Sequence, residues 1–346
     1  MWPRPLVTLN DMISSVPPKI LNKLKTPVMH PKPERPMQAI APAIDMALIL
    51  KDFEFAELMY DTSPEREQKG MRVYRAVGSE IPNIMLELGR LREETFRTVG
   101  EGSGLDRDID QFDPYYDHFV AWDKGKQEIT GAYRIGRVDQ ILKKYGTEGL
   151  YTNSLFQFKE LLETDFSQGT LEAGRSFVRP EYQRGLSLLV IWMAFARFIM
   201  ANPHYKNMMG PVSISNEFKE NSKTLMISYL MKNFPHEKSA LVSSKNPPAL
   251  DTNLAPEELV AILNASMNLT ALQEFVRFAE DNPKAQIPQL IKLYLELGVK
   301  FLAFNKDDEF NTIDGLIWLD ITAVPESVGI RYFGEGWKTY LAFHGK

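Results

Sequence analysis

The segment from residue 170 to residue 200 limits the possible folds more than any other part of the chain. Residues 170–178 read Thr-Leu-Glu-Ala-Gly-Arg-Ser-Phe-Val and are typical of a strand. Residues 180–185 predict a turn, and the nearly all-apolar run at 186–200 predicts a buried helix. A strand that leads through a turn into the start of a helix presents backbone N–H groups to a ligand. This arrangement predicts a site for an anion or a pantetheine arm.

The predicted strand carries two charged side chains, Glu172 and Arg175. A buried carboxylate beside such a site is a candidate base for an amine nucleophile. Side chains alternate along a strand, so residues three apart face opposite sides unless a β-bulge intervenes. A bulge would also spread the sheet and free backbone groups for a ligand. The alternative is a solvent-facing glutamate and a salt-bridged arginine.

Composition excludes several classes of function. The chain has 346 residues, 44% of them hydrophobic, which is enough for one large domain or two ordinary ones. The formal net charge of -5 argues against sequence-independent nucleic-acid binding, which needs clustered cations. The absence of cysteine excludes thiol nucleophiles, disulfides and thiolate metal sites, and the histidines show no ligand spacing, so we expect no metal. The apolar run at 186–200 contains Arg197 and is shorter than the roughly 20 residues of a membrane span.

Residues 1–45 hold nine of the 22 prolines. Proline disfavours continuous helices and central strands, so we expect an extended arm. Such an arm either is a poorly ordered tail or lies along its own domain or a partner subunit. The remaining residues, 46–346, are expected to form one domain, with a helical extension at 46–75 and a helical insertion at 235–297.

Hydrophobic periodicity and turn residues predict alternating helices and strands in that domain. Helices are expected at 43–60, from 82 to the glycines near 100, and at 138–144, 155–162, 183–202, 216–233, 256–297 and 325–343. Strands are expected at 118–122, 128–138, 170–178, 208–214, 299–304 and 313–321. Strands that first form a hairpin and are later separated by helices indicate an α/β (α+β) protein, a mixed sheet with helices on its faces.

A second group of charged residues lies between 92 and 134. Arg92, Phe96 and Arg97 close a helix. The acidic loop that follows contains Asp106, Asp108, Asp110 and Asp113. Arg134 stands in an otherwise apolar strand, where an unpaired cation is costly, so we expect it to pair with one of these aspartates. A network of this kind would fix a loop or hold a substrate's ammonium group; the alternatives are a solvated loop and an edge-exposed arginine.

These motifs, taken in order, resemble a known family. The order is Arg92, Phe96, Asp110-Gln111-Phe112-Asp113, Gly131-Ala132-Tyr133-Arg134 and Glu172-x-x-Arg175. It is similar to that of the acyl-homoserine-lactone synthases and of the amino-acid N-acyltransferases of bacterial aminolipid synthesis, both branches of the GNAT superfamily. The sequence of residues 172–182 looks most similar to that of the ornithine-lipid and glycine-lipid N-acyltransferases, a branch often described as hemolysin-like. The resemblance covers about residues 75–345.

The resemblance implies a GNAT-like fold, with a mixed, mostly antiparallel twisted sheet, splayed central strands and flanking helices. It implies an N-acyltransferase that moves a long-chain, 3-hydroxylated acyl group from acyl carrier protein to the amine of a small amino acid, giving a lyso-aminolipid. No cofactor would be bound permanently, and acyl carrier protein or acyl-coenzyme A would be the co-substrate. It implies a cytoplasmic protein with peripheral contact at the inner membrane. The aromatics Trp337, Tyr340 and Phe343 would supply that contact, unless they pack in the core.

The resemblance also implies roles for individual residues. Glu172 becomes the candidate general base, with Arg175 beside it as the second candidate catalytic residue. The acceptor would be bound by Arg92, Phe96, Asp110, Asp113 and Arg134. The acyl and pantetheine groups would be bound by Phe177, Val178, Gln183, Arg184 and Gly185, and backbone amides near 177–178 would stabilise the oxyanion.

One departure from the superfamily pattern concerns the acyl donor. The pyrophosphate loop of the superfamily, Arg/Gln-x-x-Gly-x-Gly/Ala, is incomplete in Gln183-Arg184-Gly185-Leu186-Ser187. This favours a carrier-protein donor, whose phosphopantetheine lacks the adenosine pyrophosphate. Two other functions stay open at this point: a signal synthase that uses S-adenosylmethionine as acceptor, and a GNAT-like binding module that no longer catalyses.

Overall fold

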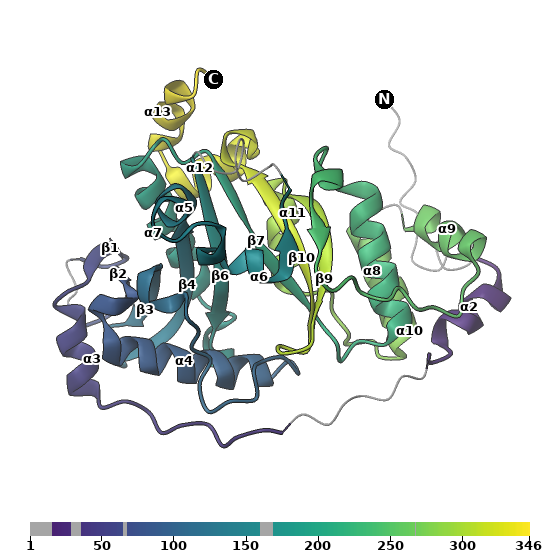
Figure 1. Cartoon of the computed structure of the whole chain (residues 1–346), viewed down its shortest axis with the longest axis horizontal. Coiled ribbons are helices and arrows are strands. Elements are labelled where there is room, and N and C mark those ends of the chain that lie inside the picture. The colour runs from purple at the N-terminus through teal and green to yellow at the C-terminus, as the bar shows by residue number, and fades with distance from the viewer. Residues whose placement is uncertain (1–15, 29–35, 65–67, 160–168, 267) are drawn as a thin grey trace.

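The computed structural model describes residues 16–28, 36–64, 68–159, 169–266 and 268–346. Within these residues, eight strands form one sheet in the order β1-β2-β3-β4-β6-β7-β10-β9 (Figure 1). Its strands are β1 (Glu57–Asp61), β2 (Met71–Val77), β3 (Asp117–Asp123), β4 (Glu128–Arg137), β6 (Thr170–Val178), β7 (Asn207–Ser215), β9 (Lys300–Asp307) and β10 (Thr312–Asp320). Two short strands, β5 (Phe156–Gln157) and β8 (Ser243–Ser244), pair separately. All neighbours in the large sheet are antiparallel except β6 and β7, which confirms the mostly antiparallel mixed sheet.

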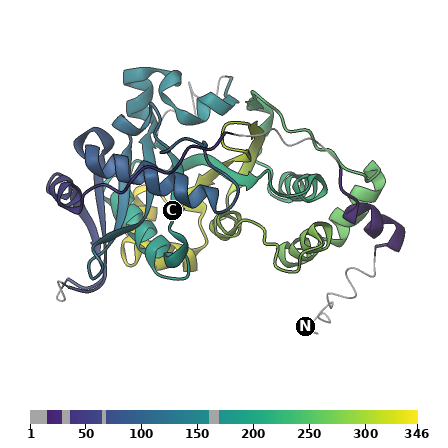
Figure 2. The same ribbon diagram turned by 90° about the horizontal axis from the view of Figure 1, so that it is seen from below.

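Helices cover both faces of this sheet (Figures 1 and 2). Those in the described residues are α2 (Pro18–Lys25), α3 (Met46–Phe53), α4 (Pro82–Arg97), α5 (Val138–Tyr145), α6 (Tyr151–Leu155), α7 (Ser187–Ala201), α8 (Glu220–Asn233), α9 (Pro256–Ala265), α10 (Leu269–Glu280), α11 (Gln289–Leu297), α12 (Glu326–Phe333) and α13 (Gly336–Phe343). The largest hydrophobic cluster joins α7, α8, α10 and α11 to one face. Two smaller clusters join α4, α5 and α6 to the other face. Among the described residues, no helix is long and apolar enough to cross a membrane.

Several predicted elements are wrong in their bounds. The helix predicted at 43–60 spans only Met46–Phe53, because residues 57–61 pair with β2 as strand β1. The last helix is two helices, since Gly334 has φ of 59° and ends α12. The helix predicted at 155–162 lies partly outside the described residues, and α6 ends at Leu155 where β5 begins.

The described part of the proline-rich segment is not extended throughout. Pro18 opens helix α2, where a proline at the first helical position costs no hydrogen bond. Leu24 of α2 is fully buried, and Lys23 Nζ lies 2.7 Å from Glu258 of α9. The side-chain amide of Asn221 on α8 donates to the Leu24 carbonyl at 2.8 Å. Helix α2 is therefore packed onto the helices after β7, while the division into arm, extension and insertion stays a prediction.

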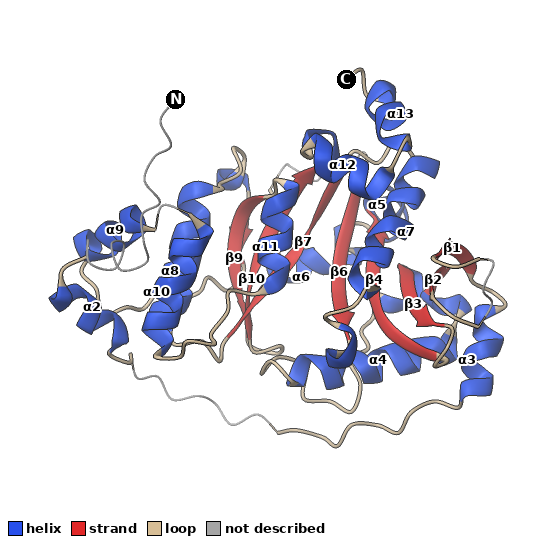
Figure 3. Cartoon of the chain, turned by 180° about the vertical axis from the view of Figure 1, so that it is seen from behind, coloured by secondary structure: helices blue, strands red, loops and turns tan. Residues whose placement is uncertain are grey.

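The two central strands diverge along their length. β6 pairs with β7 only at Thr170, Leu171 and Glu172, and the strands spread apart beyond that point (Figure 3). β6 also contains a bulge, which the spacing of Glu172 and Arg175 had left open as one of two possibilities. Ala132 of β4 pairs with Phe177 and Arg134 pairs with Gly174, so Arg175 and Ser176 together oppose one residue. Arg175 takes the left-handed conformation, with φ of 49°. The backbone groups of residues 173–178 that face β7 therefore have no strand partner.

Gly210 provides a test of how tightly the paired ends of β6 and β7 are held. A Cβ on Gly210 would lie 2.0 Å from the Ala173 carbonyl oxygen. We predict that Gly210→Ala lowers the free energy of unfolding by about 1–3 kcal/mol in urea titration, as expected for overpacking. The control is Gly174→Ala in the neighbouring strand, where a Cβ meets nothing within 4 Å. An equal loss in both variants would contradict the close approach at Gly210.

Candidate active site

The bulge in β6 directs Arg175 into a buried site on the face covered by α4, α5 and α6. Its Nε lies 3.0 Å from Asp108 Oδ2, and its Nη2 lies 3.3 Å from Asp110 Oδ2. Its guanidinium carbon also lies over two aromatic rings, 4.6 Å from the centroid of Tyr151 and 4.2 Å from that of Phe310. A cation over an aromatic ring is attracted to it. Arg175 is therefore held by ion pairs and by contacts with two rings.

Arg134 and Arg92 extend the ion pairs into the core. Arg134 Nη1 lies 2.6 Å from Asp110 Oδ1 and 3.0 Å from Asp113 Oδ1, which confirms the expected pairing with the acidic loop. Arg92 Nη1 lies 2.9 Å from Asp113 Oδ1. The side chains of Arg92, Arg134 and Asp113 are 0%, 1% and 2% exposed. The solvated-loop interpretation of this group is therefore wrong.

The charges in this network shift the pKa values of two of its buried members, Asp113 and His118. Arg92 and then Arg134 hold the pKa of Asp113 well below its usual range, although burial alone would raise it. Burial and then Arg92 lower the pKa of His118 to about 3, so this imidazole is neutral. Arg92 Nη2 lies 3.2 Å from His118 Nδ1, which places the imidazole proton on Nε2, 3.0 Å from the Asp113 carbonyl.

Glu172 is 1% exposed and is hydrogen-bonded to the first residues of helix α6. Its carboxylate accepts hydrogen bonds from the backbone N–H of Thr152 at 2.6 Å, from that of Tyr151 at 3.2 Å and from the Tyr116 hydroxyl. Tyr151 thus contacts Glu172 through its backbone and Arg175 through its ring. The bulge therefore brings both candidate catalytic residues to the same face, and the solvent-facing alternative for Glu172 does not hold.

The other residues predicted from the sequence lie around this centre. Phe96 packs edge-on against Phe310, with ring centroids 6.4 Å apart, and so supports the ring over Arg175. Phe177 is buried in the cluster with α4, and Val178 is half-buried. Three residues of the turn before α7 are exposed. The side-chain amide of Gln183 donates a hydrogen bond to the Val178 carbonyl at 3.2 Å. These turn residues are Gln183, Arg184 and Gly185.

Two carboxyl groups with raised pKa values, Asp314 and Glu101, were missed by the sequence analysis. Asp314 of β10 is 3% exposed and accepts hydrogen bonds from Ser213 Oγ at 2.8 Å and Thr312 Oγ1 at 3.3 Å. Burial, and then the charge of Asp307, raise the pKa of Asp314 to about 7. Burial, and then Asp314, raise the pKa of Glu101 to about 8. No local motif marks either residue, because their neighbours come from distant parts of the chain.

Asp314, which interacts electrostatically with Arg175, and Glu101 are thus carboxyl groups whose charge changes near neutral pH. Such groups suit proton transfer from an amine. Within the described residues, no group of histidine, aspartate and glutamate side chains could hold a metal ion.

Comparison with known proteins agrees with this chemistry. Residues 91–193, which include β3, β4 and β6, match the acetyltransferase (GNAT) domain model. The chain is 30% identical over 314 residues to a glycine N(alpha)-acyltransferase of Bacteroides thetaiotaomicron, over 86% of this chain and 90% of that protein. It is 29% identical to a glycine N(alpha)-acyltransferase of Phocaeicola vulgatus, over 75% of this chain and 82% of that protein. It is 28% identical to an L-ornithine N(alpha)-acyltransferase of Rhodobacter capsulatus, over 68% and 86% of the two chains. No solved structure matches the chain.

The fold and the site define an acyltransferase of the GNAT class. Within that class, the chain belongs to the family of the amino-acid N(alpha)-acyltransferases. The resemblance drawn from the order of the motifs is thereby confirmed.

The buried ion pairs predict a large cost for removing Asp113. Asp113→Asn leaves the charges of Arg92 and Arg134 without their shared anion. Breaking a buried pair in this way costs about 3–5 kcal/mol, and we expect that loss in the free energy of unfolding measured by urea titration. The control is Asp106→Asn, whose carboxylate pairs with Arg107 and is 47% exposed, and which should change stability by less than about 1 kcal/mol. Similar values for both variants would show that Asp113 does not hold the network together.

Proposed function

We propose that this protein transfers a long-chain, 3-hydroxylated acyl group from the thioester of acyl carrier protein to the α-amine of glycine, giving an N-acyl amino acid, a lyso-aminolipid. The observation that carries the proposal is the buried arginine–carboxylate site beside the splayed edge of β6. Glycine is preferred over ornithine as acceptor because the two relatives named for glycine match over 86% and 75% of the chain, more than any of those named for ornithine.

The splayed edge of β6 suits the donor. A phosphopantetheine arm can hydrogen-bond to the backbone groups of residues 173–178 that β7 leaves unpaired. The turn at 183–185 leads into α7, whose N-terminal N–H groups favour a phosphate. Ser187 Oγ, at the first position of α7, is buried and has no hydrogen-bond partner among the described residues. These features suit the phosphopantetheine of either donor, and the incomplete pyrophosphate loop favours a carrier-protein donor over coenzyme A.

The reaction proceeds by attack of the neutral amine on the thioester carbonyl. A C–N bond forms, the carbonyl oxygen becomes an oxyanion, and backbone N–H groups near Phe177 and Val178 receive it. One such donor is worth about 2.7–4 kcal/mol in measured enzymes. Collapse of this intermediate breaks the C–S bond, and the proton that the attacking nitrogen loses at this stage converts the leaving thiolate to the pantetheine thiol. The acceptor's ammonium group must lose a proton before the attack, so a nearby carboxylate is required.

Two carboxylates can take that proton. Glu172 is the base proposed from the sequence, but its three hydrogen bonds occupy both of its oxygens. Asp314, with its pKa raised to about 7, and Glu101 beside it offer a second route. In that case Glu172 positions Tyr151 and Thr152 rather than accepting the proton. The pH dependence of the two variants distinguishes these routes.

The product is a lipid, so we place the protein in the cytoplasm with peripheral contact at the inner membrane. Of the three aromatics proposed for that contact, Trp337 and Tyr340 are 2% exposed and belong to the core. Phe343 is 59% exposed and remains available to a bilayer surface.

Lipid mass spectrometry of a host that expresses this chain tests the reaction. We expect a new N-acylglycine lipid, reduced at least about 100-fold by Glu172→Ala, because either role of Glu172 shapes the site. The matched control is the exposed Glu148→Ala, which should leave the lipid level unchanged. A host that makes no N-acyl amino acid, although the protein is folded and acyl donors are present, would contradict the proposal.

The pH profile of the purified protein tests the proton acceptor. Asp314 must be ionised to accept a proton, so kcat/KM should rise as pH increases through about 7. We expect Asp314→Asn to remove this rise and lower kcat/KM at pH 8 by about 100-fold. Glu172→Gln should lower the rate but keep the rise. If the rise is lost in Glu172→Gln and kept in Asp314→Asn, Glu172 is the base.

A further inference from the structure

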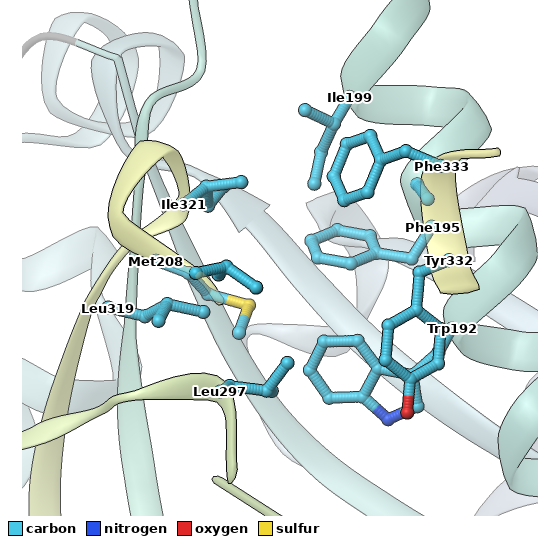
Figure 4. A pocket seen from close by; sticks show the side chains of 11 residues that line it. Trp192, Phe195, Ile199, Met208, Leu297, Leu319, Ile321, Tyr332 and Phe333 are labelled. Atoms are coloured by element: carbon cyan, nitrogen blue, oxygen red, sulfur yellow. The ribbon is translucent and has the colours of Figure 1, made fainter. Parts of the chain in front are cut away.

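Two small apolar cavities lie between helix α7 and the sheet, on the face opposite the charged site. They have volumes of about 20 Å³ and about 10 Å³. Both are lined by Trp192, Phe195 and Met208, so they are neighbours separated only by side chains. Figure 4 shows Trp192 and Phe195 on one side of the larger cavity, with Met208, Leu319 and Ile321 on the other.

The volumes decide what these cavities can hold without rearrangement. A single water needs roughly 10–15 Å³, so neither cavity accepts a long chain as it stands. Apolar cavities of this kind stay dry and favour apolar ligands. Helix α7 packs above them. An alkyl chain would enter here by separating the side chains that line the cavities.

One polar atom in this apolar surrounding has no partner. Trp192 is 7% exposed, and its indole Nε1 makes no hydrogen bond with any described residue. Leaving a buried donor unpaired is costly, so such a group in a native protein calls for a ligand or another explanation. An indole N–H can only donate, and the missing partner must therefore be an acceptor atom.

The neighbouring hydroxyl groups do not supply that acceptor. Tyr133 lines the smaller cavity, and its hydroxyl is hydrogen-bonded to that of Tyr294. The rings of both tyrosines lie close to Trp192, with centroids 5.9 Å and 6.2 Å away. These two hydroxyls are hydrogen-bonded to each other, and neither accepts a hydrogen bond from Trp192 Nε1.

The position of Tyr133 connects the cavities with the proposed acyl-transfer site. Tyr133 is the residue of β4 that opposes the bulge at Arg175 and Ser176. Met208, at the far side of Trp192, pairs with Leu171 in the part of β7 that still contacts β6. A chain that leaves a thioester at the splayed edge and enters the smaller cavity would contact Tyr133 and Trp192, which both line it.

We infer that these cavities open to receive the alkyl part of the acyl donor, and that Trp192 Nε1–H donates a hydrogen bond to an oxygen carried by that chain near its thioester end. A hydroxyl and a keto oxygen both satisfy the chemistry. An unsubstituted chain would leave the N–H unpaired. Trp192 is thus a specificity-determining residue, and this inference rests on the proposed acyl transfer.

The test compares three donors of equal chain length on acyl carrier protein: 3-hydroxyacyl, 3-oxoacyl and unsubstituted acyl. We expect kcat/KM of the wild-type protein to be about 10-fold higher for an oxygenated donor, as one neutral hydrogen bond gives about 1.4 kcal/mol. Trp192→Phe keeps the apolar ring and removes the N–H. It should reduce this ratio to about 1 while leaving the unsubstituted donor within about 3-fold.

Trp337 offers a matched control. Its indole nitrogen is also buried without a partner among the described residues, but its side chain packs against Phe333 and Tyr340 and does not line either cavity. Trp337→Phe should therefore keep the full preference. Thermal unfolding of both variants shows whether either change affects the fold.

Each outcome decides one part of the inference. Equal kcat/KM for all three donors in the wild-type protein, or an unchanged ratio in Trp192→Phe, would overturn the assignment while the acyl transfer itself still holds. If no donor is turned over, the proposed function fails, and calorimetry with 3-hydroxymyristate and myristate tests the cavity separately. Tighter binding of the hydroxylated acid, lost in Trp192→Phe, would then support the inference, and equal binding would overturn it.

Discussion

The buried set of ion pairs that joins Arg92, Arg134 and Arg175 to Asp108, Asp110 and Asp113 holds the site together. Three cations and three carboxylates in the core are tolerated only while each keeps its partner. The network joins α4, the acidic loop, β4 and the bulge of β6, which are otherwise separate elements. The bulge in turn brings Arg175 next to the rings of Tyr151 and Phe310 and sets both Arg175 and Ser176 opposite Tyr133 of β4. The charged site and the cavities beneath α7 thus depend on the same irregularity in one strand.

The parallel strands β6 and β7 separate beside the bulge. β6 and β7 stay together for only three residues, held by the close approach of Gly210 to Ala173, and then leave an edge of unpaired backbone groups. In our account the thioester lies along this edge, the amine approaches from the charged face, and the alkyl chain leaves toward the apolar face. The carboxyl groups with pKa values near 7 and 8 lie on the amine's side, where a proton must be removed.

The sequence predicted the parts of this site that are local in the chain. The strand, turn and helix at 170–200 could be read directly, and the spacing of Glu172 and Arg175 raised the bulge as a testable alternative. Arg134 could be paired with the acidic loop because an isolated cation in a strand is costly. Asp314, Glu101, Tyr151 and Phe310 could not be found in this way, since each has an ordinary local pattern and gains its role from packing against distant residues. The helix predicted at 43–60 failed because the tertiary pairing of β1 with β2 outweighed local helical periodicity.

The most direct test of the account is product analysis with the purified protein, 3-hydroxyacyl carrier protein and an equimolar mixture of glycine and ornithine. Mass spectrometry would identify the acylated product and the nitrogen that carries the acyl group. Our account predicts N-acylglycine as the main product, formed in step with release of the free carrier-protein thiol. Consumption of the thioester that yields only free 3-hydroxy acid, or acylation of neither amino acid, would contradict it.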